Sequence, residues 1–523
     1  MGRPLRRATR VRLHRGKKPP HLDELDRARP GGAVPRGGVR ATHGVRAGSI
    51  APAHAVRRHG QRELLMAVHP TPEPTTRDTS MTRSSLRRFR LTLAVTLLAG
   101  AALACDSLLN VQAPSRVPAS VLDDPANAEL AVNGAQADFE CAYTSYAALG
   151  GMLAGELEDA TLSAGRWDYD RRTVTSGDAY GPNQCNDGSF LGLYTPLSVA
   201  RFQADNAASH LQGWTDAQVT DRHMLIAKAS AYAGYSLVLL GEGFCSAAID
   251  VGPQLMPNQL LDSAEARFST AVTEATTANA TDLLNLALVG RARTRLDLAN
   301  STGALADAQL VPAGFEYDAT YSSSNLRREN LIFQQLNKFP FNTIAVPYRQ
   351  FMYVFADTLV PGKVDSVPDP RVAVQFNAAT TMFDNRHGQY VQLKYATIAS
   401  PIPLATTTEA QLIIAEIQGG PTAVNIINAL HAAVGLPAFH ATDPDSIRQQ
   451  VIYERAAEFF LDGHHLGDVN RFNLTLFPAA GTPYPVDAAN PKGGFYGVGR
   501  RFPLPDKERF NNPNIPSTVN PGC

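Results

Sequence analysis

The sequence predicts a mostly α-helical protein built from helix pairs, with long irregular segments between them. Apolar residues recur at three- and four-residue spacing in several blocks within residues 126–312 and again within 405–472, as in amphipathic helices. Residues 313–404 are instead rich in Pro, Asn, Ser and aromatic residues, and residues 473–523 in Pro, Gly and Asn. These segments predict a loop-rich lobe and C-terminal loops, and long loops of a compact domain usually carry function.

The first 80 residues differ in composition from the rest of the chain. They contain 17 Lys/Arg against 6 Asp/Glu, a net charge of +11, and show no sustained apolar period. One interpretation is a basic nucleic-acid-binding arm or targeting tail. The composition and the segment that follows favour another: residues 1–80 are a disordered, non-native extension from a start codon assigned too far upstream.

Residues 81–104 have the pattern of a signal peptide. Four arginines after Met81 precede an apolar run over residues 91–104, which is short for a permanent membrane span. Small residues precede Cys105 and resemble a lipoprotein box, so we expect acylation there, and two or more acyl chains give stable anchoring. The alternative is ordinary secretory cleavage nearby, with Cys105 as a bystander. Residues 105–125 are Pro- and Ser-rich and predict a tether.

The remainder of the chain is acidic and long enough for a sizeable core. Residues 105–523 contain 42 Asp/Glu against 27 Lys/Arg, a net charge of −15, which argues against nucleic acid and anionic membrane surfaces as partners. The chain of 523 residues is 44% hydrophobic, which favours more than one subdomain.

Four further cysteines suggest two disulfides, because an even number in an exported protein usually pairs. Three connectivities are open for Cys141, Cys185, Cys245 and Cys523. No CxxC or Cys/His spacing typical of a zinc site occurs, so we expect no metal.

Taken in order, the helical blocks are short, alanine-rich and often paired. Between the first two of them, residues 156–189 are polar and predict a loop. Asp262 is a plausible N-cap for the fourth block. Repeated pairs with alanine at contact positions resemble tetratricopeptide-type repeats, although the period is irregular. The expected helices cover residues 126–150, 193–213, 224–241, 262–277, 283–299, 304–311, 409–418 and 422–434.

Residues 451–473 (VIYERAAEFFLDGHHLGDVNRFN) begin as a further helix, which Gly463 can end. Glu454 and Glu458 lie one turn apart and could be the paired carboxylates of a glycoside hydrolase. With Arg455 beside them, they are better explained as ion pairs within the helix. His464 and His465 lack the His-Glu-x-x-His arrangement of zinc hydrolases, so packing or capping is favoured over metal binding.

The same stretch resembles the closing signature of SusD/RagB-type outer-membrane lipoproteins. Further fragments resemble the family in the expected order, although His431 replaces the arginine usual after the Ile-Asn pair. Together they span most of the mature chain. The fragments are KASAYAGYSLVLLGEGF, LALVGRARTRLDLAN, the element Asp369-Pro370-Arg371, EAQLIIAEIQ, IINALHAAVGL and the ending RRFPLPDKERFNNPNIPSTVNPGC.

The resemblance implies a tetratricopeptide-like helical scaffold with a variable loop-rich lobe. It implies a lipid-anchored protein on the outer-membrane surface that binds a glycan or similar nutrient and passes it to a TonB-dependent, SusC-like barrel. No catalysis and no cofactor are implied. A helical-repeat scaffold that binds only proteins, and an exported glycoside hydrolase, are the alternative functions.

Ligand contacts are expected from the polar stretch after the first helix. Trp167 stands there between charged residues, and sugar rings stack on aromatic faces while polar neighbours bond the hydroxyls. We therefore predict Trp167, Asp168, Tyr169 and Tyr180 as ligand residues; the alternative for Trp167 is burial. A second aromatic cluster is more typical of a core: Tyr348, Phe351 and Tyr353.

Overall fold

The computed structural model describes residues 119–186, 188, 190–356, 363–486, 492–516 and 518. The predictions for residues 1–80, residues 81–104, Cys105 and Cys523 lie outside the described residues. The end of the expected tether contains a short helix, α3 (Ala119–Leu122), and a second one, η1 (Pro125–Asn127), begins at its last residue.

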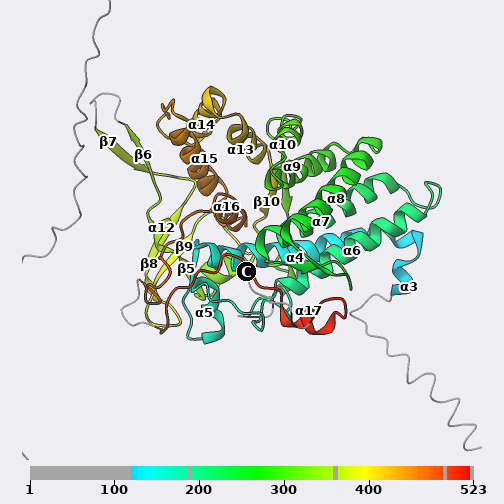
Figure 1. The fold of residues 1–523 in the computed structure, drawn as a ribbon, viewed down its shortest axis with the longest axis horizontal. Helices are drawn as coiled ribbons and strands as arrows, with labels where there is room; N and C mark the ends of the chain where they lie inside the picture. The colour runs from blue at the N-terminus through cyan, green and yellow to red at the C-terminus, as the bar shows by residue number, and fades with distance from the viewer. Residues whose placement is uncertain are drawn as a thin grey trace, which may run out of the picture. The chain divides into compact units, whose positions relative to one another are not determined.

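The first helical region is a row of helices packed in chain order (Figure 1). Each helix packs on the next, and the predicted blocks are all present with ends displaced by a few residues. The row comprises α4 (Ala128–Ala154), α6 (Tyr194–Gly213), α7 (Arg222–Gly243), α8 (Pro257–Thr277), α9 (Thr281–Asp297) and α10 (Ser301–Ala308). Asp262 lies inside α8 and is not its N-cap, because Pro257 starts the helix and Gln259 accepts a bond from the Met256 amide at 2.9 Å.

Helix α7 is the centre of this row. It is long and apolar enough to cross a membrane by length and composition, but 89% of its most apolar window is buried inside the protein. Glycines packed against an aromatic ring explain how closely its neighbours approach. A Cβ on Gly234 of α7 or Gly290 of α9 would lie 2.9 Å or 2.4 Å from the Phe268 ring of α8.

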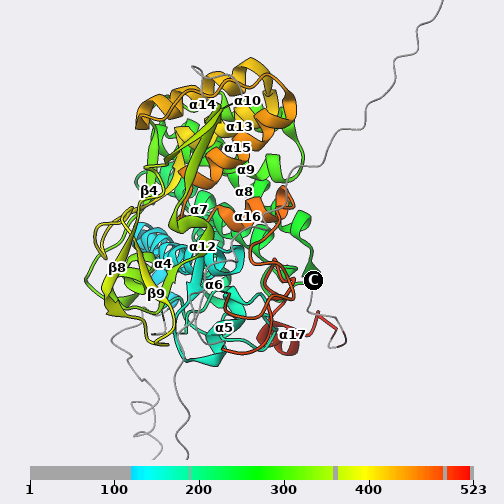
Figure 2. The same cartoon turned by 90° about the vertical axis from the view of Figure 1, so that its left-hand side faces the viewer.

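A second helical region packs against α9 and α10. It comprises α13 (Thr407–Gln418), α14 (Gly420–Val434), α15 (Pro444–Glu458) and α16 (His465–Arg471). In Figure 2, α13, α14 and α15 lie above α7 and α16, away from α5 (Ala164–Asp170). The short helix α17 (Asp506–Asn511) follows near the end of the chain.

The loop-rich lobe contains short strands. Among the described residues, all sheets are two-stranded and antiparallel: β1 (Leu157–Asp159) with β5 (Asn342–Ile344), β2 (Ala247–Ala248) with β3 (Gln254–Leu255), β4 (Glu316–Ala319) with β10 (Ile402–Thr406), β6 (Met352–Ala356) with β7 (Val364–Pro368), and β8 (Val374–Thr381) with β9 (Gly388–Gln392). Short helices lie between them: η2 (Leu326–Arg328), α11 (Leu331–Phe333), η3 (Gln334–Lys338) and α12 (Val346–Arg349). The predicted mostly α fold with a loop-rich lobe is confirmed.

The acids of α15 are ion-paired, but the partner predicted from sequence is wrong. Arg371 of the lobe contacts Glu454 at 2.5 Å and Glu458 at 2.9 Å, while Arg455 contacts Asp468 at 2.9 Å. The helix ends at Glu458, five residues before Gly463, whose φ of +94° allows the turn that follows. These ion pairs join the lobe to the helices, which local sequence spacing does not reveal.

The two histidines after α15 are packed. His464 lies between Asp462 at 2.8 Å and Glu409 at 3.3 Å, and it stacks on Phe459. The His465 Nε2 lies 3.1 Å from the Tyr348 hydroxyl. The predicted packing role is therefore confirmed for both side chains.

Buried Glu156 makes the free energy of unfolding depend on pH. One carboxylate oxygen accepts a hydrogen bond from the Leu461 amide at 3.0 Å, and the other has no hydrogen-bond partner among the described residues. Burial raises the pKa of Glu156 from 4.5 to about 8. Between these pH values the folded state binds a proton that the unfolded state lacks, so this group lowers stability as pH rises.

Glu156→Gln should therefore flatten the fall in unfolding free energy between pH 5 and pH 8. The amide keeps the acceptor for Leu461 and cannot ionise, which removes a slope of up to about 1.4 kcal/mol per pH unit. Urea unfolding at several pH values measures the slope, with the exposed Glu129→Gln as control. Equal slopes in Glu156→Gln and wild type would contradict this assignment.

Candidate functional site

The candidate site is built on β1 and the turn that follows it. Asp159 ends β1 and fixes this turn, because its Oδ1 accepts hydrogen bonds from both the amide and the hydroxyl of Thr161 at 2.9 Å. Thr161 in turn accepts a hydrogen bond from the Trp167 indole N–H at 3.0 Å through its carbonyl. The turn and the tryptophan are thus positioned by one buried carboxylate.

A buried network of ion pairs and hydrogen bonds holds this turn in place. Arg166 contacts Asp159 at 2.6 Å and donates to Asn342 at 2.7 Å, so α5 is tied to β5. Lys492, from the C-terminal loops, donates to the Asp159 carbonyl at 2.5 Å and contacts Asp384 at 3.0 Å. Residues from α5, from β5, from the loop at Asp384 and from the C-terminal loops therefore meet at this turn.

The network contains carboxyl groups with opposite pKa shifts. Burial, together with the neighbouring Asp159, raises the pKa of Asp170 to about 7, and its carboxylate accepts a bond from the Tyr484 hydroxyl at 2.9 Å. Burial would also raise the pKa of Asp384, but His387 and Lys492 hold it well below its usual range.

Three phenylalanines form an aromatic row beside this turn. The ring centroids of Phe339 and Phe341 are 5.5 Å apart, and those of Phe341 and Phe383 are 5.2 Å apart. Phe339 is 37% exposed and Phe383 50% exposed. The backbone of Ala160 aligns the row, since its amide donates to the Phe341 carbonyl and its carbonyl accepts from the Asp384 amide.

The turn after β1 carries a further exposed apolar side chain. Leu162, in the turn after β1, is 60% exposed. The Arg166 guanidinium lies 5.5 Å from the Phe341 ring centre and supports it on the protein side. Rings backed by buried charges and open to solvent are suited to stacking on an apolar ligand face.

Trp167 and Asp168 are half-buried in α5, where a loop was predicted. The Trp167 ring lies 5.7 Å from the Lys492 ammonium and 6.5 Å from the Tyr484 ring. Asp168 bonds Arg171 at 2.5 Å and Thr173 at 2.6 Å. A ligand role for this pair of residues stays a prediction.

The prediction that Tyr169 and Tyr180 contact a ligand does not fit the structure. They are 1% and 0% exposed and pack around Phe502, a residue of the C-terminal loops. The Tyr180 hydroxyl donates to the Pro503 carbonyl at 2.6 Å. Both tyrosines are core residues because a distant segment covers them.

A disulfide fastens the segment that carries Tyr180. Cys141 of α4 bonds Cys185, with a Cα–Cα distance of 5.7 Å. Cys245 also forms a disulfide, and its partner lies outside the described residues. The second aromatic cluster is core as expected, since Tyr348 and Tyr353 are 5% and 1% exposed.

The aromatic row was missed from the sequence. Its members come from two segments, around residues 339–341 and at residue 383, that the fold brings together. The only signal was the aromatic content of residues 313–404 as a whole.

Comparisons with solved structures decide the fold. A SusD-like carbohydrate binding protein from Bacteroides vulgatus ATCC 8482 matches with a TM-score of 0.55 at 15% identity, covering 75% of this chain and 98% of that one. A SusD-like protein from Bacteroides fragilis NCTC 9343 matches with a TM-score of 0.56 at 12% identity, covering 76% and 98%. The chain has the SusD-like fold.

The SusD-like fold was therefore predicted correctly from the sequence fragments. A laminarin binding SusD-like protein matches with a TM-score of 0.51 at 14% identity and covers 75% of this chain and 98% of that one. No family model and no curated protein matches the sequence.

Proposed function

We propose that this protein is a surface-exposed, lipid-anchored binding protein that captures a glycan or similar nutrient and delivers it to a TonB-dependent, SusC-like outer-membrane barrel. The observation that carries the binding role is the exposed aromatic row Phe339–Phe341–Phe383 on a buried ionic support. Solved proteins of the same fold are described as carbohydrate binding and laminarin binding, which supports a glycan as ligand.

The site binds without catalysing hydrolysis. Asp170 lies beside Asp159 and has a raised pKa, as the acid of a glycosidase carboxylate pair does, but both side chains are at least 96% buried. Arg166, Lys492 and Tyr484 occupy their oxygens, so neither carboxyl group reaches a glycosidic bond. Glu454 is likewise fully buried against Arg371 and His431.

A glycan array probed with the purified chain tests the binding role. We expect binding to at least one oligosaccharide class, and chromatography of the bound sugar should recover it uncleaved. An array with no binding, or cleavage that one carboxylate variant abolishes, would count against the proposal.

Acylation at Cys105 is proposed from the lipoprotein-like sequence around it. Wild type should fractionate with membranes and bring a large barrel with it from mild detergent. Cys105→Ala should move to the soluble fraction. Membrane association that persists in Cys105→Ala would contradict the lipid anchor.

A further inference from the structure

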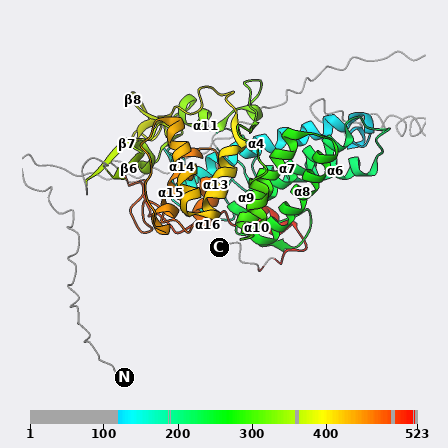
Figure 3. The ribbon, with the colours of Figure 1, turned by 90° about the horizontal axis from the view of Figure 1, so that it is seen from above.

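A groove runs between α4 and α6, and Leu122 of α3 and Arg327 of η2 also line it. Figures 1 and 3 both place α6 and the start of α4 on the side opposite β8. The groove has a volume of about 650 Å³, within the range of small-molecule pockets. It shares no lining residue with the aromatic row of the lobe.

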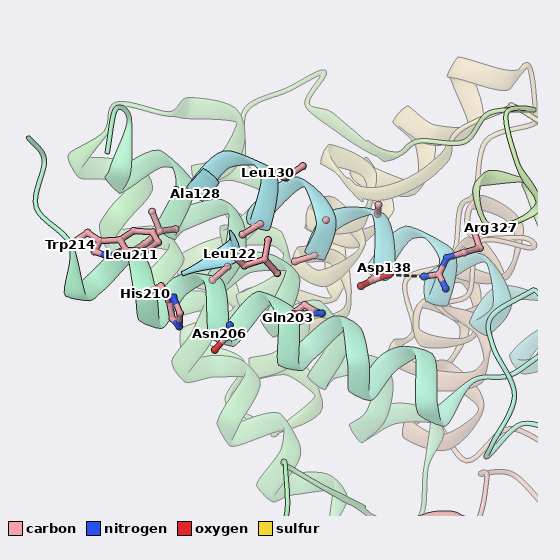
Figure 4. A pocket seen from close by; sticks show the side chains of 15 residues that line it. Leu122, Ala128, Leu130, Asp138, Gln203, Asn206, His210, Leu211, Trp214 and Arg327 are labelled. Atoms are coloured by element: carbon pink, nitrogen blue, oxygen red, sulfur yellow. Dashed lines mark hydrogen bonds and ion pairs between the residues drawn. The ribbon is translucent and has the colours of Figure 1, made fainter. Parts of the chain in front are cut away.

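The α6 side of the groove is a row of uncharged or weakly basic side chains ending in a tryptophan (Figure 4). Gln203, Asn206 and His210 recur at three- and four-residue spacing, and Trp214 caps the helix. At 1.5 Å per residue, the row from Gln203 to Trp214 extends about 16 Å. This length suits a chain of several sugar units better than a monosaccharide.

The α4 side is open because it carries small residues. Ala131, Gly134 and Ala137 line it, and a Cβ built on Gly134 would have no heavy atom within 4 Å. The exposed Leu130 extends this wall towards α3. A ligand could therefore lie directly on the backbone of α4.

The hydrogen-bonding capacity of the groove is unused. Within the part of the chain that the structure describes, the side chains of Gln203 and Asn206 form no hydrogen bond to the protein. The charged groups are paired, since Asp138 contacts Arg327 at 2.5 Å and His210 lies 3.5 Å from Asp123. The groove thus offers free amides and an aromatic ring, without an unpaired charge for an ionic ligand.

We propose that this groove is a second binding site for an uncharged oligosaccharide. The Trp214 ring stacks on the C–H face of one sugar, and the two amides bond hydroxyl groups along the row. This site goes beyond the proposed function, which assigns the ligand to the lobe, and each site can fail without the other.

The chain has two tryptophans, so binding at each site can be followed separately by tryptophan fluorescence. Trp167→Phe leaves Trp214 as the only indole, and Trp214→Phe leaves Trp167. Each protein is titrated with laminarihexaose, maltohexaose, cellohexaose and xylohexaose while tryptophan emission is recorded. We expect at least one of these sugars to shift the Trp214 emission with a saturable curve.

Further variants in the Trp167→Phe background then test whether the sugar that changes Trp214 emission is bound in the groove. Gly134→Leu fills the groove and improves helix propensity, so it should abolish the response without lowering the thermal midpoint. Gln203→Ala with Asn206→Ala should weaken binding about tenfold, through two lost hydrogen bonds. The exposed Gln212→Ala on the same helix is the matched control and should bind as the parent does.

Two results would overturn the groove site. One is that no sugar changes the Trp214 emission. If Trp167 emission alone changes, the groove site is likewise ruled out and only the lobe site is supported. The other is a response that persists unchanged in Gly134→Leu, which would place the ligand elsewhere.

Discussion

We expect Arg371→Ala to lower the free energy of unfolding by about 3–5 kcal/mol, the usual cost of breaking a buried ion pair by removing one partner. Arg371 bonds Asp369 through two nitrogens, at 3.0 Å and 2.6 Å, in addition to its contacts with Glu454 and Glu458. Asp369 and Glu454 have fully buried side chains, so the variant would leave Asp369 without a counter-charge and Glu454 with His431 as its basic partner.

Urea unfolding followed by circular dichroism measures this effect. The matched control is Arg267→Ala, because Arg267 pairs with Asp205 at 2.9 Å on the surface, with a side chain 35% exposed. A surface pair of this kind contributes about 0–1 kcal/mol. If Arg371→Ala cost no more than Arg267→Ala, the ion pairs would not be what joins the lobe to the helices.

The second large effect is on ligand binding. We expect the double variant Phe339→Ala/Phe383→Ala to bind its oligosaccharide about 10- to 100-fold more weakly, because aromatic anchors dominate binding energy where they stack on a ligand. Both rings are already 37–50% exposed, so the unfolding free energy should change by no more than about 1 kcal/mol. Phe510→Ala is the control, since this 63% exposed ring lies on α17.

The helices could be predicted because their signal is local. Apolar spacing within one helix located α4, α6, α7 and α9, and the Gly419-Gly420 break separated α13 from α14. Ends were less accurate where a proline intervened, as at Pro257, which starts α8 five residues before the expected N-cap.

The candidate site could be predicted only in part, because it is assembled by tertiary contacts. Tyr180 stands in a polar stretch that looks exposed, yet Phe502, more than three hundred residues later, covers it. Arg371 lies 83 residues from Glu454, so sequence spacing favoured the adjacent Arg455 instead. Phe341 and Phe383 form one surface only after β5 and the loop between β8 and β9 come together.

Calorimetric titration tests whether the aromatic row of the lobe binds an oligosaccharide. The titrant is the oligosaccharide that binds most tightly on the glycan array. It is added separately to wild type, to Phe339→Ala/Phe383→Ala and to Phe510→Ala. We expect saturable binding to wild type and Phe510→Ala, and at least about tenfold weaker binding to the double variant. Equal affinity in all three proteins would contradict this expectation.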